Sequence, residues 1–137
     1  MFLLGLGSNL PSSFGDRFEN LNLAVSYLEL YKVKIIKKSS FYETPSYPDI
    51  KNPKFINIVV KVFTYLSPED LASVLIRVEK KLERKRKKKN APRTCDIDII
   101  DYNGKVVNFT YKGLIFKVPH EELTLRNFVL YPLKEVA

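Results

Sequence analysis

Residues 55–65, FINIVVKVFTY, form the clearest strand pattern in the chain. Ile58, Val60 and Val62 are two residues apart, and in a strand such residues point to the same face. The residues that follow, Ser67-Pro68-Glu69-Asp70, are typical of a helix start, because a serine N-cap is followed by proline and by acids in the first turn. An apolar stripe at helical spacing comes next, formed by Leu71, Val74, Leu75, Val78 and Leu82. This region therefore predicts a strand followed by an amphipathic helix.

The patterns on either side continue the alternation of strands and helices. We expect strands over residues 2–6, 33–42 and 96–102, a helix over 16–31, and a loop over 44–53, which holds three prolines. Asn103-Gly104 predicts a hairpin turn into a strand over 105–108, and the tail after Pro119 predicts a loop and a short helix. This order favours an α+β fold, a ferredoxin-like sandwich in which helices pack on one face of a mostly antiparallel sheet.

Composition is ordinary for a globular protein. The chain has 137 residues, of which 45% are hydrophobic and 28% charged, and this argues against a disordered, collagen-like or coiled-coil chain. A single cysteine, Cys95, cannot form an internal disulfide, which favours a reducing compartment. The apolar start, residues 1–6, lacks a basic flank, and no apolar run approaches the length of a membrane helix. We therefore expect a cytoplasmic protein with no membrane association.

The positive charge is concentrated in one segment. Net charge is +8, and residues 80–89, here called the basic segment, hold eight basic residues and one acid, Glu83. Such a segment can bind a nucleic-acid backbone or close over a nucleoside triphosphate. It can also be a solvated helix end, because Lys and Arg are favourable near the negative end of the helix dipole. Charge alone leaves these three interpretations open.

The motif Cys95-Asp96-Ile97-Asp98-Ile99-Ile100 combines a core strand with two carboxylates. In a strand, Asp96 and Asp98 share one face while Ile97 and Ile99 pack on the other. Two carboxylates so close can converge on Mg²⁺, although alternating acids are also common on a solvent-facing strand. The basic segment and Arg93 directly precede the pair. This combination suits a metal–polyphosphate complex, in which carboxylates hold Mg²⁺ and cations neutralise phosphate oxygens.

Other motifs are less specific. No G-x-x-x-x-G-K-[ST] sequence is present, which excludes a P-loop enzyme. We interpret Gly5-Leu6-Gly7-Ser8-Asn9 as a turn that ends a strand. The single histidine, His120, is either structural or a phosphate ligand, and it cannot by itself form a zinc site. Phe55 and Phe128 are either core residues or a pair of rings that sandwich a flat heterocycle.

Residues 89–100, KNAPRTCDIDII, resemble the signature of the 6-hydroxymethyl-7,8-dihydropterin pyrophosphokinase family, enzymes of folate biosynthesis. That signature has a basic residue, a small residue before Pro-Arg, and then Asp, an apolar residue, Asp and two apolar residues. Further similar segments occur in the same order: Gly7-Ser8-Asn9-Leu10, residues 40–45, residues 55–57, Pro119-His120 and residues 126–130. The resemblance covers nearly the whole chain and implies a single pyrophosphokinase domain over residues 1–137.

The resemblance implies transfer of the diphosphate of ATP to the hydroxymethyl group of the reduced pterin, with release of AMP. Asp96 and Asp98 match the magnesium-binding aspartates of the family, so the implied cofactor is Mg²⁺, two ions with ATP. Arg84 and Arg93 match arginines that contact the polyphosphate and assist transfer. The implied ATP-binding residues are Glu79, Arg86, Lys89, Ile99, His120 and Arg126. The implied pterin-binding residues are Thr44, Pro45, Tyr47, Phe55, Asn57 and Phe128. On this interpretation the basic segment closes as a lid over bound ATP. The protein is then a monomer that binds ATP and the pterin and no nucleic acid.

Some positions depart from the family pattern. Asn90 and Glu121 stand where aromatic residues are frequent, Glu83 replaces a frequent glycine and Ile76 a frequent glutamine, and the chain ends before the tail of many members. These differences concern rate and nucleotide affinity more than reaction type. Two alternatives follow from them and from the charge. One is a catalytically weakened member with a structural or regulatory role, and the other is an RNA-binding protein whose affinity falls steeply with salt.

Overall fold

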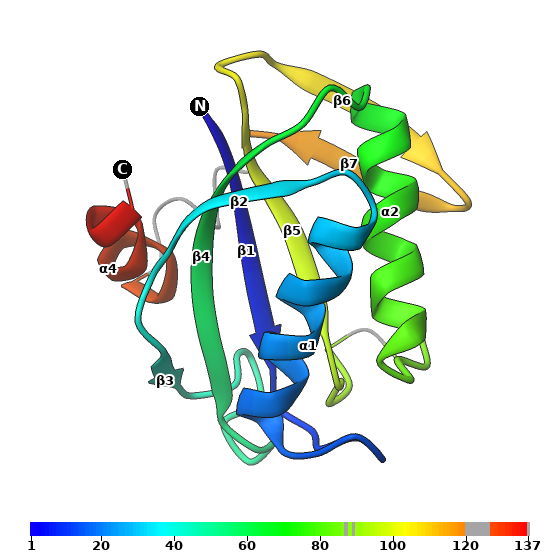
Figure 1. The fold of residues 1–137 in the computed structure, drawn as a ribbon. Helices are drawn as coiled ribbons and strands as arrows, with labels where there is room; N and C mark the ends of the chain where they lie inside the picture. The colour runs from blue at the N-terminus through cyan, green and yellow to red at the C-terminus, as the bar shows by residue number, and fades with distance from the viewer. Residues whose placement is uncertain (87, 89, 120–126, 137) are drawn as a thin grey trace.

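A computed structural model describes residues 1–86, 88, 90–119 and 127–136 of the chain, which fold into a main sheet, a separate hairpin and three helices (Figure 1). In chain order the elements are β1 (Phe2–Ser8), α1 (Arg17–Leu30), β2 (Lys34–Lys38), β3 (Tyr42–Thr44), β4 (Phe55–Phe63), α2 (Pro68–Lys81), β5 (Asp96–Tyr102), β6 (Val107–Tyr111), β7 (Leu114–Val118) and α4 (Asn127–Val136). None of the helices in these residues is long and apolar enough to cross a membrane.

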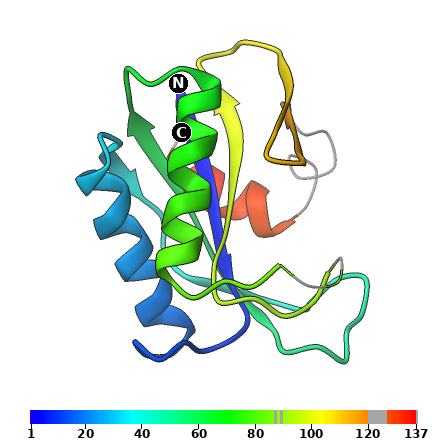
Figure 2. The same ribbon diagram turned by 90° about the vertical axis from the view of Figure 1, so that its right-hand side faces the viewer.

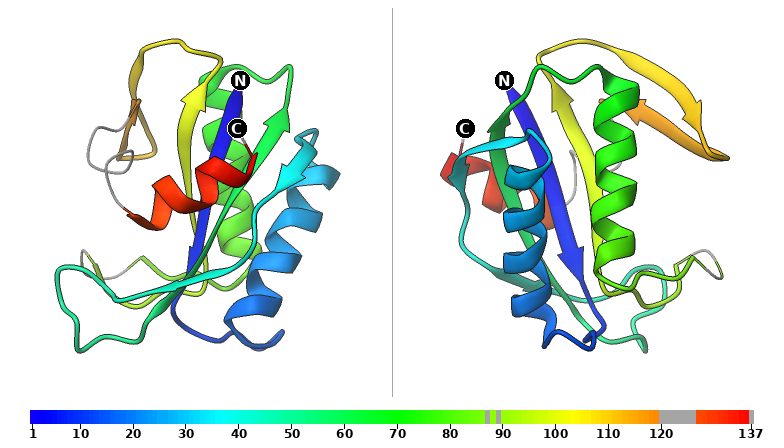
Figure 3. Two further views of the ribbon diagram at one scale, coloured as in Figure 1. Left: turned by 90° about the vertical axis from the view of Figure 1, so that its left-hand side faces the viewer. Right: turned by 45° about the vertical axis from the view of Figure 1, so that its right-hand side comes forward.

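The main sheet is antiparallel throughout. Its strands lie in the order β2-β4-β1-β5, and β3 pairs with the beginning of β4. Helices α1 and α2 cover one face, and α4 crosses the other face (Figures 2 and 3). The predicted α+β, ferredoxin-like sandwich is confirmed. The expectation that all helices pack on one face is wrong, because α4 packs against β4, β3 and β2 from the opposite side.

Apolar side chains fill both sides of the sheet. The larger core lies beneath α1 and α2 and includes Leu4 and Leu6 of β1, Ile58, Val60 and Val62 of β4, and Ile97 and Ile99 of β5. A smaller cluster on the α4 side joins Leu3, Val59, Ile100 and Val136. The alternation of side chains along each strand therefore supplies both layers.

Both long helices begin where the sequence predicts. Asp16 caps α1 in a capping box with Glu19, and Ser67 caps α2 by accepting a hydrogen bond from the Asp70 N–H at 3.1 Å. Side-chain oxygens at these positions satisfy backbone donors that have no partner within the helix.

The predicted strand over residues 33–42 is divided in two. The Ser39 hydroxyl oxygen accepts the hydrogen bond of the Val59 N–H at 2.9 Å, in place of a backbone carbonyl. Ser39 N–H still donates to the Val59 carbonyl, at 3.0 Å. The side chain thus interrupts the regular ladder between β2 and β3, because it competes with the backbone for the same donor.

The predicted hairpin after β5 is wrong in its strand pairing. Asn103 and Gly104 do form a tight turn with positive φ angles, but only one bridge, Tyr102 to Lys105, follows it. The chain then leaves the main sheet, and β6 pairs with β7 across a second turn at Lys112-Gly113. This hairpin contacts α2, where the Tyr111 hydroxyl donates to Ser73 Oγ at 3.1 Å.

Candidate functional site

Two glycines of β1 separate the carboxylates of β5 from the side chains of β4. Gly7 pairs with Asp96 on one side and with Asn57 on the other, and Gly5 pairs with Asp98. Directly paired residues share a face of the sheet, with Cβ atoms about 5 Å apart. Asp96, Asp98 and Asn57 therefore share the face that carries α4.

Gly5 and Gly7 lie inside the strand rather than in the predicted strand-ending turn. A Cβ atom at Gly7 would lie 2.8 Å from Asn57 Oδ1 and 3.4 Å from a ring carbon of Phe55. At Gly5 it would lie 3.1 Å from the end of the Ile100 side chain. A side chain at Gly7 would therefore collide with Asn57, whereas one at Gly5 would need only a small shift of Ile100. A glycine inside a strand pattern can signal such a close approach.

The carboxylates stand in a strongly charged environment. Burial raises the pKa of Asp98 well above its ordinary value, and the neighbouring Asp96 and Glu79 add to this effect. Ionisation of Asp98 beside these two acids is therefore costly unless a cation approaches. Arg84 supplies one such cation, since its Nη1 lies 2.9 Å from Asp96 Oδ1.

Glu79 joins the end of α2 to β5. Its carboxylate pairs with Arg84 at 2.8 Å and Arg86 at 2.7 Å, and it accepts the Ile97 N–H at 2.9 Å. Burial raises the pKa of Glu79, while the charge of Arg84 opposes that effect. In Arg84, burial alone lowers the pKa, but Asp96 and Glu79 outweigh it and hold the pKa above its ordinary value. The two arginines are thus folded back onto one buried acid.

Arg93 connects the carboxylates with the aromatic side of the site. Its Nη1 lies 3.9 Å from Asp96 Oδ2, and its Cζ lies over the Phe55 ring, 5.2 Å from the centroid. Within the described residues, the buried Nε of Arg93 has no hydrogen-bond partner. The guanidinium therefore keeps donor capacity inside the site.

Asn9 holds the backbone of Arg93 in place, and the sequence did not predict this contact. Its side-chain oxygen accepts the Arg93 N–H at 2.8 Å, its own N–H donates to the Arg93 carbonyl at 3.1 Å, and its Nδ2 donates to the Pro53 carbonyl at 3.1 Å. Asn9 is 1% exposed. The sequence does show a polar residue directly after a buried strand. It does not reveal the hydrogen-bond partners of that residue, because they are distant in the sequence.

The predicted pterin residues lie in three parts of the fold. Asn57 donates to Thr44 Oγ1 at 2.7 Å, and Phe55 lies beside them, half-buried, at the start of β4. Pro45 and Tyr47 are exposed in the loop that follows β3. Phe128 belongs to α4 on the same side of the sheet, but its side chain is outside the described part.

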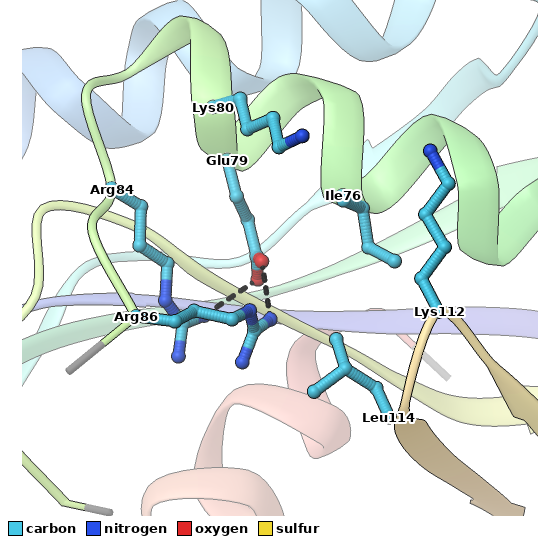
Figure 4. Close-up of a pocket in the computed structure, with 7 residues that line it drawn as sticks. All are labelled: Ile76, Glu79, Lys80, Arg84, Arg86, Lys112 and Leu114. Carbon is cyan, nitrogen blue, oxygen red and sulfur yellow. Dashed lines mark hydrogen bonds and ion pairs between the residues drawn. The ribbon is translucent and has the colours of Figure 1, made fainter. Parts of the chain in front are cut away.

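A cavity of about 240 Å³ opens between the end of α2 and the β6–β7 hairpin (Figure 4). Its lining residues are Ile76, Glu79, Lys80, Arg84, Arg86, Lys112 and Leu114. Figure 4 shows Ile76 and Leu114 on one side of the cavity and Arg84 and Arg86 reaching toward Glu79 on the other. Lys112 and Leu114 were missed because the hairpin that carries them was not predicted.

The remaining predicted residues are not brought into this group. Ile99 is 5% exposed and lies in the core on the opposite face from the aspartates. Its contact with ATP stays a prediction. Lys89, His120, Glu121 and Arg126 lie outside the described residues.

The donor set fits a magnesium–phosphate complex. No group of three or more His, Cys, Asp or Glu side chains forms a metal cluster in the part of the chain that the structure describes. Mg²⁺ usually binds one or two carboxylates and takes its other ligands from water and substrate phosphates. The pair Asp96 and Asp98, beside two arginines, has this composition.

Comparison with known proteins is consistent across nearly the full length. The model of the 7,8-dihydro-6-hydroxymethylpterin-pyrophosphokinase family matches residues 3–137. The chain is 38% identical to 2-amino-4-hydroxy-6-hydroxymethyldihydropteridine pyrophosphokinase of Aquifex aeolicus, over 97% of this chain and 78% of that protein. It is 37% identical to the Bacillus subtilis protein of the same name, over 97% and 75%. It also matches the bifunctional protein FolKE of Lactococcus lactis at 39% identity, over 97% of this chain and 36% of that protein. The chain thus belongs to the 7,8-dihydro-6-hydroxymethylpterin-pyrophosphokinase family.

Proposed function

We propose that this chain carries out the reaction of its family on the α4 face of the main sheet. In that reaction the hydroxymethyl group of 6-hydroxymethyl-7,8-dihydropterin takes the diphosphate of ATP, and AMP is released, a step of folate biosynthesis. The observation that carries this proposal is the position of Arg93, which touches both Asp96 and Phe55. One side chain thus lies between the residues suited to phosphate and those suited to a flat heterocycle.

On the phosphate side, Arg84 and Arg93 are the proposed catalytic residues. The alcohol oxygen bonds to the β-phosphorus of ATP while the bond from that phosphorus to the α–β bridging oxygen breaks. AMP leaves with the bridging oxygen and its negative charge, and the alcohol proton passes to water. Two guanidinium groups beside Asp96 can donate charge-assisted hydrogen bonds to the transferred and leaving oxygens. Catalysis of this kind depends mainly on positioning and charge stabilisation.

Asp96 and Asp98 are the proposed ligands of two Mg²⁺ ions. When bound with ATP, the ions would screen the phosphate charge and orient the diphosphate for in-line attack. The chain contributes two carboxylates on one face of a rigid strand, and the raised pKa of Asp98 is consistent with a group that awaits a cation.

The cavity between α2 and the β6–β7 hairpin is the proposed site for the nucleoside end of ATP. Ile76 and Leu114 provide apolar contact for a base, and Lys80, Lys112 and Arg86 provide cations around it. Arg84 belongs both to this cavity and to the ion pair with Asp96. The phosphate chain would therefore run from the cavity toward the aspartates.

Phe55, Asn57 and Thr44 are the proposed core of the pterin site, with Pro45, Tyr47 and Phe128 around them. Asn57 is 8% exposed and is oriented by its hydrogen bond to Thr44, so its remaining amide groups have a fixed direction. Fixed polar groups beside an aromatic ring suit recognition of a planar heterocycle with hydrogen-bonding edges.

Residues 1–137 are proposed to act as one domain, and as a monomer in the cytoplasm. The larger core cluster, which α1, α2 and the strands of the main sheet share, supports the first point. The buried free thiol of Cys95, whose pKa is raised by burial, suits a reducing compartment.

The direct test is release of AMP from ATP and Mg²⁺, measured with and without the reduced hydroxymethylpterin. Pterin-dependent AMP supports the proposal, with pterin diphosphate as the second product. ADP as product, or AMP at equal rates without pterin, contradicts it.

A further inference from the structure

The chain leaves α2 through a backbone turn that normally requires glycine. Arg84 N–H donates to the Glu79 carbonyl at 3.0 Å, and Glu83 N–H donates to the Lys80 carbonyl at 2.9 Å. These two bonds define the Schellman arrangement, in which the residue after the cap has a left-handed conformation. Here that residue is Glu83, with a φ of 66°. A side chain at this position is strained, so other contacts must stabilise it.

The Glu83 side chain supplies such contacts from a distant part of the chain. One carboxylate oxygen accepts the Ser13 N–H at 2.7 Å, and the other accepts the Ser13 hydroxyl at 2.5 Å. We call this pair of hydrogen bonds the Glu83–Ser13 latch. Hydrogen bonds from Ser13 lower the pKa of Glu83, so its carboxylate is ionised at neutral pH. It joins the exit of α2 to the connection between β1 and α1.

The latch determines the direction in which the next residue leaves the helix. Arg84 follows Glu83 directly, and its guanidinium turns back to Glu79 and Asp96. Its side chain is 9% exposed, so it has little freedom to reach these partners from another backbone direction. The geometry at Glu83 and the position of Arg84 at the aspartates are therefore linked.

We propose that Glu83 is a positioning residue for the reaction, acting through its latch with Ser13 to orient Arg84 before ATP binds. The inference rests on the proposed role of Arg84 at the phosphates. Glu83 is the one acid among the eight cations of residues 80–89, yet both of its oxygens bond Ser13. It acts by geometry, and its charge opposes ATP binding.

The test compares Glu83→Ala, Glu83→Gln, Glu83→Gly and Ser13→Ala with the wild type. Glu29→Ala is the matched control, because Glu29 is an exposed acid on α1 and its loss changes net charge equally. Two quantities are measured without pterin: amide hydrogen exchange at Arg84, and the dissociation constant of a non-hydrolysable ATP analogue with Mg²⁺. The AMP assay then gives kcat and KM for ATP.

Glu83→Ala is expected to exchange the Arg84 amide about ten-fold faster and to weaken ATP binding about five- to ten-fold, an effect within the range of a typical intramolecular hydrogen bond. Glu83→Gln keeps an acceptor for the Ser13 N–H and stays close to the wild type. Glu83→Gly lies between them in exchange, because glycine tolerates the turn without the latch. Ser13→Ala gives a smaller effect, since the backbone donor remains.

Several outcomes overturn the proposal. If Glu83→Ala and Glu83→Gln both bind ATP more tightly, Glu83 acts through its charge alone. If exchange at Arg84 rises while ATP affinity and KM match Glu29→Ala, the latch stabilises the turn without positioning Arg84. If Glu83→Ala does not fold, Glu83→Gly decides in its place, and wild-type exchange and ATP affinity in that variant overturn the proposal. A wild type that binds ATP but forms no pterin-dependent AMP refutes the proposed function, and the binding comparison then still decides the latch.

Discussion

The guanidinium of Arg93 lies over the ring of Phe55, 5.2 Å from its centroid, while its Nη1 stays 3.9 Å from Asp96. In the proposed site, a pterin stacked on this ring would meet the arginine proposed to contact the phosphates. The two proposed substrate regions would therefore share one side chain, and we expect a change at Phe55 to affect both.

Phe55→Leu removes the ring but keeps an apolar side chain. We expect KM for the pterin to rise about five-fold, because aromatic stacking adds about 1 kcal/mol beyond buried area. KM for ATP should change less, since Arg93 keeps its approach to Asp96. Steady-state kinetics with each substrate varied in turn measures the split. An unchanged pterin KM would remove Phe55 from the proposed site.

Asp98→Asn is expected to lower kcat about a thousand-fold, since a bound metal supplies several kcal/mol of charge stabilisation. It should nevertheless raise the thermal stability of protein treated with a chelator. The pKa of Asp98 is raised above its ordinary 3.8, so the folded state binds this proton more tightly than the unfolded state. Stability therefore falls as pH rises from about 3.8 through the raised pKa.

The asparagine variant removes this pH dependence because it does not titrate. Urea unfolding of both proteins at several pH values, in chelator, measures the difference. A variant less stable than the wild type at neutral pH, or one with full activity, contradicts the argument.

Glu79→Ala should lower the free energy of unfolding by about 3 kcal/mol, the cost of breaking a buried ion pair. The change leaves Arg84 and the Ile97 N–H without the acceptor they share. Glu79→Gln keeps an acceptor for Ile97 and should cost less. Urea denaturation followed by circular dichroism compares the two, and equal stability of all three proteins would show that the buried acid contributes nothing.

Gly7→Ala should raise KM for the pterin more than Gly5→Ala does. At Gly7 the new methyl group would lie 2.8 Å from Asn57 Oδ1 and would displace the side chain that bonds Thr44. At Gly5 it would meet only the flexible end of Ile100. Gly5→Ala is therefore the matched control, and equal pterin KM values in the two variants would contradict this role of Gly7.

Glu135 attaches α4 to the sheet. Its carboxylate accepts hydrogen bonds from the Ser40 N–H and hydroxyl, each at 2.9 Å, and from the Tyr42 hydroxyl. Because α4 also carries Phe128, we expect Glu135→Ala to raise KM for the pterin with little change in KM for ATP. Tyr42→Phe keeps the ring and should show a weaker effect in the same direction.

The pH range of this attachment follows from both pKa shifts. The Tyr42 hydroxyl lowers the pKa of Glu135 below its ordinary 4.5, so the stabilisation is present above that pH and is lost as pH falls through the lowered value. Glu135 in turn raises the pKa of Tyr42 above 10.0, so its contribution is lost only as pH rises through the raised value. Limited proteolysis near α4 should therefore be slow from about pH 5 to 10 in the wild type. Equal rates in Glu135→Ala would contradict the attachment.

Local signals predicted much of the fold and of the site. The strand over 96–102 and the starts of both long helices were confirmed, because alternation and caps depend on neighbours in the sequence. The carboxylates of Asp96 and Asp98 share a face for the same reason.

What could not be predicted depends on residues far apart in the sequence. Gly7 is needed because Asn57 lies on the neighbouring strand, and Asn9 matters because it bonds Arg93. The face chosen by α4 depends on Leu3 and Val59, which leave an apolar surface there. None of these partners leaves a periodic signal, and the turn at Asn103-Gly104 did not reveal which strand β6 would pair with.

Strand β5 encodes the core and the carboxylates in alternate positions, Ile97 and Ile99 on one face and Asp96 and Asp98 on the other. Inserting or deleting one residue there would exchange the two sets, placing acids in the core and isoleucines in the site. Length variation within residues 96–102 would therefore abolish folding and catalysis together. Natural or designed recombination of such chains should therefore keep β5 whole and place its junctions in turns outside the proposed site.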